Sequence, residues 1–145
     1  MKDIKINIVG YWADNVKRDI PKCKGIYFVL ARKNSDNRLL YIGKAKDEDI
    51  NARLANHERH DDFIRSCKDG EGIYYAYAEV DKVDIDIVEN ALIYAEEPPL
   101  NAELKDRFNY GEVHIETYGY NDILQYKKYS IRCPGEYIEE EVEED

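Results

Sequence analysis

The feature that most constrains the fold is a pair of apolar segments separated by a polar turn, between Gly25 and Gly43. The first covers residues 25–31 and the second residues 39–43, and the turn sequence NSDN occupies 34–37. Apolar segments on both sides of an Asn/Asp/Ser cluster are typical of a β-hairpin. We therefore predict a hairpin that opens on Gly-Ile-Tyr and closes on Tyr-Ile-Gly.

The tyrosines at these two ends share a face of the hairpin only in some registers. Opposed residues of antiparallel strands share a face, so Tyr27 and Tyr41 lie together when the residue numbers of each pair have an even sum. A pairing of Ala31 with Tyr41 meets this condition and leaves a loop of five residues. A pairing of Lys33 with Arg38 would place the two rings on opposite faces.

Composition excludes several classes of protein. The chain has 145 residues, 43% of them hydrophobic and 36% charged, which is typical of one soluble domain. No apolar segment has the length of a membrane span, and the first residues lack a signal-peptide pattern. Three cysteines without a C-x-x-C pair argue against a disulfide scaffold and a thiolate metal cluster. We expect a cytoplasmic protein with no membrane partner, and the oligomeric state stays open.

Charge is distributed unevenly along the chain. Residues 136–145 carry seven of the acids that give the net charge of −10, and we predict a disordered tail there, after a domain of residues 1–135. Residues 22–46 instead carry seven bases and one acid. This basic segment can bind phosphate, or the acidic tail, although ordinary solvated charges explain it equally well. The bases are Lys22, Lys24, Arg32, Lys33, Arg38, Lys44 and Lys46.

Two further segments have helical periodicity. The first is predicted to begin at an N-cap, Asp47 or Asp49, and to continue to about Cys67. The second is predicted over residues 84–96 and is stopped by the two prolines at 98–99. The first helix has a stripe of residues at spacings of three and four, formed by Ile50, Leu54, His57, Asp61 and Ile64.

Period-two alternation and β-branched residues predict strands at 1–11, 73–80 and 113–118. Together with the hairpin and the helices, these strands indicate a mixed α+β domain. We expect a small antiparallel sheet, made of the hairpin and a third strand, flanked by helices.

Glu89 is the carboxylate that most needs an explanation. It borders the apolar stripe of the second helix, where an uncompensated charge is costly to bury. It could bind a metal, or it could form a capping box with Asp86.

Other candidate residues also have ordinary explanations. Arg53 could pair with Asp49 one helical turn away. His57 and His60 have no second pair of ligands to complete a zinc site. The tyrosines could be plain sheet aromatics.

Phosphodiester hydrolysis needs few protein groups. A carboxylate can hold Mg²⁺, an arginine can bind the phosphate, and a tyrosine or histidine can handle the proton of the attacking water. The chain carries such groups in the order Tyr27, Tyr41, Arg53, His57, Glu89 and Asn101. In this order and spacing they resemble the GIY-YIG nuclease superfamily. The matching motifs are GIY at 25–27, YIG at 41–43, NARLANH at 51–57, VENALI at 88–93 and EPPLN at 97–101.

The resemblance implies a metal-dependent endonuclease that hydrolyses phosphodiester bonds in nucleic acid, DNA ahead of RNA, with one Mg²⁺ or Mn²⁺. It implies that Glu89 holds the metal and that Arg53 binds the scissile phosphate. Tyr27 would act as general base or would orient the attacking water, with Tyr41 hydrogen-bonded beside it.

The resemblance also implies that His57 relays a proton or holds phosphate and that Asn101 braces the site. Nucleic acid would further contact Lys44 and other bases of the hairpin, with these four as candidates: Arg32, Lys33, Lys44 and Lys46. The alternative is a catalytically inactive module of the same fold that binds nucleic acid or a protein.

Overall fold

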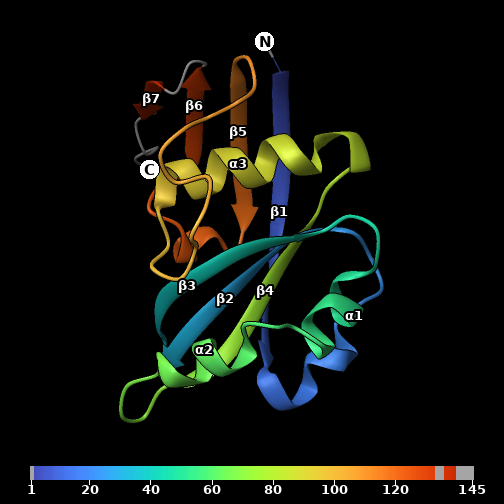
Figure 1. The fold of residues 1–145 in the computed structure, drawn as a ribbon, viewed down its shortest axis with the longest axis vertical. Helices are drawn as coiled ribbons and strands as arrows, with labels where there is room; N and C mark the ends of the chain where they lie inside the picture. The colour runs from blue at the N-terminus through green and yellow to red at the C-terminus, as the bar shows by residue number, and fades with distance from the viewer. Residues whose placement is uncertain (1, 133–135, 140–145) are drawn as a thin grey trace.

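A computed structural model describes residues 2–132 and the backbone of residues 136–139. Its centre is one seven-stranded sheet in the order β3-β2-β4-β1-β5-β6-β7, in which only β1 and β5 are parallel (Figure 1). The fold is therefore mixed α+β. The strands are β1 (Lys2–Ala13), β2 (Gly25–Lys33), β3 (Asp36–Ala45), β4 (Gly72–Glu79), β5 (Val113–Gly119), β6 (Lys128–Arg132) and β7 (Glu136–Glu139). The helices are α1 (Ile50–Ala55), α2 (His60–Arg65) and α3 (Ile85–Glu96), with 3-10 segments η1 (Asp14–Asp19), η2 (Lys82–Asp84) and η3 (Asn121–Ile123).

The predicted hairpin lies between two hydrophobic cores. Along β2, Ile26 and Phe28 point to the core that α3 covers, whereas Tyr27 and Val29 point to the core beneath α1 and α2. The alternation follows from the period of two in a strand. Because every residue of 25–31 is buried, this strand is covered on both faces, and its sequence is almost continuously apolar.

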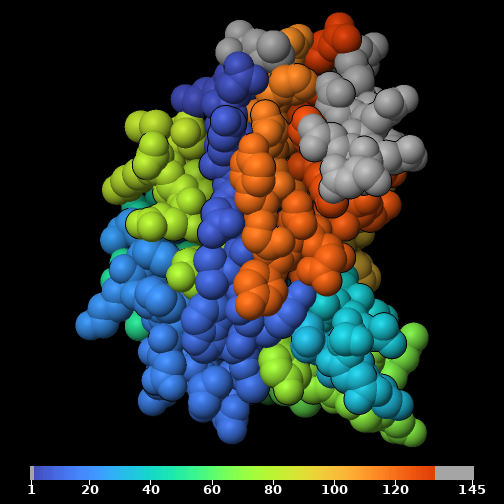
Figure 2. All heavy atoms as spheres, turned by 180° about the vertical axis from the view of Figure 1, so that it is seen from behind, coloured from blue at the N-terminus to red at the C-terminus, as the bar shows by residue number. Residues whose placement is uncertain are grey.

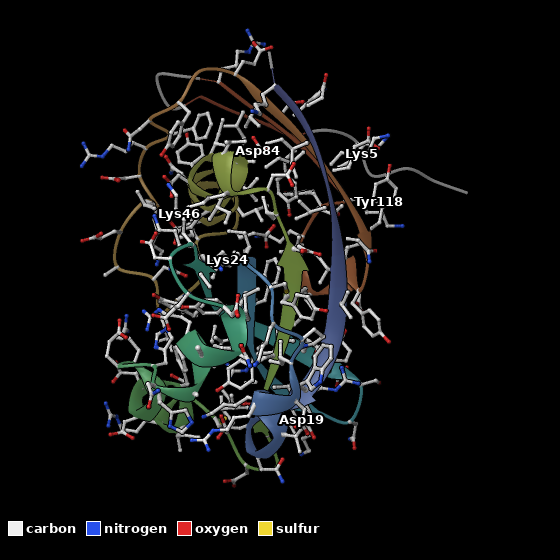
Figure 3. The ribbon with its side chains drawn as sticks, turned by 90° about the vertical axis from the view of Figure 1, so that its right-hand side faces the viewer. Lys5, Asp19, Lys24, Lys46, Asp84 and Tyr118 are labelled. Carbon is white, nitrogen blue, oxygen red and sulfur yellow. The ribbon has the colours of Figure 1, made fainter. Side chains whose placement is uncertain are left out.

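The part of the sheet formed by β1, β5 and β6 has helix on one face only. Figure 1 shows α3 crossing these strands, and Figure 2 shows β1 and β5 side by side on the opposite face. In Figure 3, Lys5 and Tyr118 project from that outer face. Polar and apolar residues alternate along β1 for this reason, with Ile4, Ile6 and Ile8 buried against α3.

The hairpin does not form the Ala31–Tyr41 pairing, but near Tyr27 and Tyr41 the residue numbers of each pair still have an even sum. Tyr41 pairs with Val29 instead of Ala31, and Ala31 pairs with Arg38, so the turn is shorter than expected. A β-bulge between Val29 and Leu30 inserts one extra residue on β3. Such an insertion shifts the face of all later side chains by one position. The bulge therefore returns Tyr41 to the face of Tyr27.

The single helix predicted as far as Cys67 is also wrong, because the chain forms two short helices. Asn56 leaves the helical region with φ −130° and ψ 43°, and α2 begins only at His60. Of the predicted stripe, Ile50, Leu54 and His57 are buried, whereas Asp61 and Ile64, which follow the break, are exposed. Helical periodicity does not predict this break, because the spacing of three and four residues continues through it.

The sheet is larger than the expected hairpin plus third strand, because β1, β5, β6 and β7 extend it. The predicted acidic tail begins with residues 136–139, whose backbone forms β7, and residues 140–145 lie outside the described residues. Among the described residues, no helix has the length and apolar character that a membrane crossing needs.

Candidate active site

The candidate residues gather at the edge of the sheet that β3 forms. β3 has a neighbouring strand on one side only, and both α3 and α1 contact it, from opposite faces of the sheet. Side chains from the two faces can therefore meet beside β3. This arrangement brings Glu89 of α3 near the aromatic residues that lie beneath α1 and α2.

Four rings form a cluster on the face beneath α2, in which Tyr27, His57 and Phe63 are buried and Tyr41 is half-buried. Tyr27 Oη lies 2.8 Å from His57 Nε2, and the Tyr27 ring is stacked against Tyr41 with centroids 6.3 Å apart. The imidazole of His57 contacts both phenol rings edge-on, and Phe63 closes the cluster beneath them. Tyr27 and Tyr41 therefore share a face of the hairpin, as an even-sum register requires.

Gly43 is required by the packing of this cluster. A Cβ atom built on Gly43 would lie 2.2 Å from the Cζ and Oη atoms of Tyr27, far inside van der Waals contact. The last residue of the Tyr-Ile-Gly motif therefore makes room for the ring of the Gly-Ile-Tyr motif. Glycine is needed because the backbone at Gly43 lies close to the Tyr27 ring, and the two residues are direct partners in the hairpin.

Hydrogen bonds fix the tautomer of His57. Its Nδ1 accepts a hydrogen bond from the backbone N–H of Arg59 at 3.1 Å, so we assign the ring proton to Nε2, which donates to the Tyr27 oxygen. Burial and the positive charge of Arg53 lower the pKa of His57 to about 4, so the ring is neutral at pH 7. With the oxygen of Tyr27 accepting from His57, the phenolic proton is free to be donated elsewhere.

Burial dominates the ionisation of both phenols. It raises the pKa of Tyr27 and of Tyr41 above the ordinary value; Arg53 acts in the opposite direction, and Glu89 reinforces the rise. Both phenols are therefore neutral near pH 7.

Arg53 does not pair with Asp49, as one interpretation of the sequence proposed. Its Nη1 and Nη2 donate to the two carboxylate oxygens of Glu58 at 2.7 and 2.9 Å. Asp49 instead lies at the N-cap position of α1 and binds Lys24 at 3.2 Å. The hydrogen bonds from Arg53 lower the pKa of Glu58 to about 2, so the pair is ionised throughout the physiological range.

Glu89 lies in the middle of α3 with a side chain 14% exposed. Burial raises the pKa of its carboxyl group, and Lys44 partly offsets this at an Nζ–Oε1 distance of 3.6 Å. Lys44 binds Asp86 more closely, at 2.9 Å, and Lys46 binds the other oxygen of Asp86 at 2.7 Å; Figure 3 labels Lys46 beside α3. The capping-box interpretation is wrong, because Asp84 is the N-cap residue and Asp86 lies inside the helix.

A cleft of about 510 Å³ joins these groups. Glu89 and Asp86 line it from α3, Tyr41 and Lys44 from β3, and Glu58, the partner of Arg53, from the link between α1 and α2. The lining residues are Tyr41, Lys44, Glu58, Arg59, Asp86, Glu89, Asn90, Ile93, Asn101, Ala102, Glu103, Leu104, Asn109 and Tyr110. We expected Tyr27, Arg53, His57 and Glu89 to line one cleft, but of these four only Glu89 does. Arg53 lies behind its partner Glu58, and Tyr27 and His57 are buried with their rings against Tyr41.

Asn101 braces the strand instead of pointing into the cleft as a free ligand. Its Oδ1 accepts from the N–H of Ile42 and its Nδ2 donates to the carbonyl of Ile42, both at 2.9 Å. The N–H of Leu100 also donates to the carbonyl of Leu40 at 3.0 Å. The segment after the two prolines thus pairs with the open edge of β3 and holds Tyr41 in place.

The bases proposed for nucleic acid lie in two places. Lys44 lines the cleft and Lys46 lies beside it through Asp86. Arg32 is at the far end of the hairpin, where its guanidinium lies 4.0 Å from the Tyr11 ring centroid, and Lys33 follows it there. Only the first two are placed near the cleft.

The donor set fits a magnesium ion with a single protein carboxylate. Within the described residues there is no group of three or more His, Cys, Asp or Glu side chains that could hold a metal ion. Mg²⁺ is commonly bound by one or two carboxylates and completed by water and phosphate. Glu89 offers one carboxylate in a cleft with room for those ligands, and Lys44 lies 3.6 Å from its Oε1 atom.

Sequence reasoning missed two acids of the site. Asp86 carried a usable signal, since it lies three residues before Glu89 on the same helix face. Glu58 carried none, because a spacing of five residues from Arg53 does not bring two side chains together on a continuous helix. The break after α1 makes that pairing possible.

Comparisons with protein family models, with curated proteins and with solved structures find no match for this chain.

Proposed function

We propose that this chain is a metal-dependent endonuclease of the GIY-YIG type that hydrolyses phosphodiester bonds in nucleic acid, with DNA as the first candidate. One observation carries the proposal: Glu89 of α3 and Tyr41 of β3 line one cleft, and Arg53, from the opposite face of the sheet, reaches it through its partner Glu58. These are the groups that phosphodiester hydrolysis needs, and they lie far apart in the sequence.

In the proposed reaction Glu89 would hold the ion, which would polarise the phosphate and lower the pKa of a bound water. Arg53 would bind phosphate oxygens with its planar guanidinium. Tyr41 would orient the attacking water at the cleft surface. Behind it, Tyr27 accepts a hydrogen bond from His57, so its own proton can be donated toward Tyr41 or water. Because burial keeps both phenols neutral, orientation of the water is favoured over a resident phenolate base.

The experiment is cleavage of supercoiled plasmid with Mg²⁺ or Mn²⁺, compared among the natural chain, Glu89→Gln and Glu103→Gln. Glu103 also lines the cleft, is exposed, and loses the same charge, so it is the matched control. We expect Glu89→Gln to reduce cleavage more than about 100-fold, because even outer-shell partners of a metal contribute about 10- to 100-fold. Retained cleavage in Glu89→Gln, or none in the natural chain with either metal, would contradict the proposal.

A binding module without catalysis is the second candidate. The observation that favours it is that the cations near the cleft are already paired with acids of the same chain, Lys44 and Lys46 with Asp86 and Arg53 with Glu58. The same plasmid experiment, read by gel retardation, separates the two candidates. Retention without cutting supports the module.

A further inference from the structure

The guanidinium of Arg53 is already bound as a two-oxygen anion would bind it. Two of its nitrogens donate to two oxygens of one carboxylate, at 2.7 and 2.9 Å. Carboxylate and phosphate are both recognised by arginine in this forked geometry. Glu58 therefore occupies the position at Arg53 where the proposed reaction needs a phosphate.

The position of Glu58 allows it to leave. Its side chain is 65% exposed, whereas that of Arg53 is 24% exposed and is held on α1. Glu58 lies in the short link between α1 and α2 and lines the cleft. Apart from Arg53, a basic side chain within 4.0 Å of its carboxylate is His57, whose Nδ1 lies 3.9 Å away. That ring is neutral at pH 7 and does not hold Glu58 in place by charge. Rotation of one exposed side chain is enough to free Arg53.

We propose that Arg53 is a two-oxygen anion site that the chain closes with its own carboxylate, and that a phosphodiester binds there by displacing Glu58. The inference rests on the proposed function and adds a residue that sets the affinity of the site for its substrate. Acid does not open the site under physiological conditions, because the pKa of Glu58 is about 2. Displacement by another anion is the remaining route.

Displacement of Glu58 by a phosphodiester has a measurable effect on the affinity of the protein for nucleic acid. The displaced carboxylate loses a forked ion pair and stays near the incoming phosphate, which it repels. Loss of an exposed pair weakens binding roughly two- to fivefold, and one like charge about 6 Å away in water adds about threefold. Glu58→Gln removes both effects, so we expect it to bind nucleic acid about six- to fifteenfold more tightly.

Exchange also has an effect on salt dependence. A protein cation that binds a phosphate releases counterions from the nucleic acid, with a slope of about 0.9 per phosphate for duplex DNA. In the natural chain the freed Glu58 attracts a cation from solution, which offsets part of that release. The slope of log K against log salt should therefore be steeper in Glu58→Gln, by at most about 0.9.

The test is fluorescence anisotropy of a short labelled DNA duplex, in EDTA to prevent cleavage, at several NaCl concentrations. The matched control is Glu71→Gln, because Glu71 forms the same forked pair with Arg38, at 2.9 and 2.7 Å, outside the cleft. We expect tighter binding and a steeper slope for Glu58→Gln and Glu58→Ala, and no change for Glu71→Gln. Adding Arg53→Gln to Glu58→Gln should remove the gain.

A second probe separates this inference from the proposed function. Inorganic phosphate is titrated while the Nε–Hε resonance of Arg53 is followed by NMR. A phosphate-dependent shift in Glu58→Gln, much weaker in the natural chain, supports the closed anion site even when no duplex is bound or cut. Equal duplex affinity and slope for the natural chain and Glu58→Gln, or no shift of Arg53 in Glu58→Gln, would overturn the inference whether or not the chain cleaves plasmid.

Discussion

Replacing Gly43 with alanine tests how the two halves of the hairpin motif depend on each other. The added Cβ would lie 2.2 Å from the Cζ and Oη atoms of Tyr27, where ordinary contact begins at 3.4 Å. The ring would have to retreat by about 1 Å, and it is 1% exposed, so no free space receives it. Movement of the ring also pulls its oxygen from His57 Nε2, now 2.8 Å away.

The magnitude follows from two contributions. Overpacking a core costs about 1–3 kcal/mol, and leaving a buried hydrogen-bonding group without its partner costs about 1–3 kcal/mol. Movement of the ring relieves the overpacking but breaks the hydrogen bond to His57. The two costs are therefore not fully additive. We expect Gly43→Ala to lower the free energy of unfolding by about 2–4 kcal/mol, a large part of the 5–15 kcal/mol typical of a domain.

Urea unfolding followed by circular dichroism measures this change. The control is Gly72→Ala, in the second Gly-Ile-Tyr of the chain, where a Cβ would meet only the Tyr74 ring, at 3.7 Å. There we expect a change within about 1 kcal/mol, in the stabilising direction, since alanine loses less backbone entropy than glycine on folding. A cost below about 0.5 kcal/mol for Gly43→Ala would refute the packing argument.

The other predictions concern the supports of the site. Asn101→Ala removes both hydrogen bonds to Ile42 and should cost about 2–3 kcal/mol, with faster amide exchange at Ile42; protection equal to that of the natural chain would contradict the bracing role. For His57, whose pKa falls from 6.5 to about 4 on folding, the unfolded chain takes up the proton first as pH drops. Stability should therefore be full above pH 6.5 and fall by up to about 3 kcal/mol as pH approaches 4, and His57→Gln should flatten that part of the pH profile measured in urea.

Local sequence signals predicted the elements that local physics controls. Alternating and apolar segments located β1, β2, β4 and β5, and the two prolines ended α3 where expected. The same signals failed between residues 50 and 67. The helical spacing continues through Asn56, but the helix itself ends before it. There the tertiary structure buries His57 against the rings of Tyr27 and Tyr41.

The site shows the same division. The residue types at Tyr27, Arg53 and Glu89 could be selected from sequence because their chemistry is specific and their order is distinctive. The sequence did not predict which of these side chains are buried: Tyr27 and His57 are buried, whereas Tyr41 lines the cleft. Depth depends on which elements cover the sheet edge, and that is not encoded in any single segment.

The sequence alone determined the hairpin, the helix that carries Glu89 and the α+β class, because each depends on periodicity or on turn and cap residues within a short window. Only the tertiary structure determined the β-bulge that returns Tyr41 to the face of Tyr27 and the pairing of Arg53 with Glu58. Both result from packing between segments distant in sequence. A one-residue change of register or a break in a helix alters local energy little, but it changes completely which side chains meet.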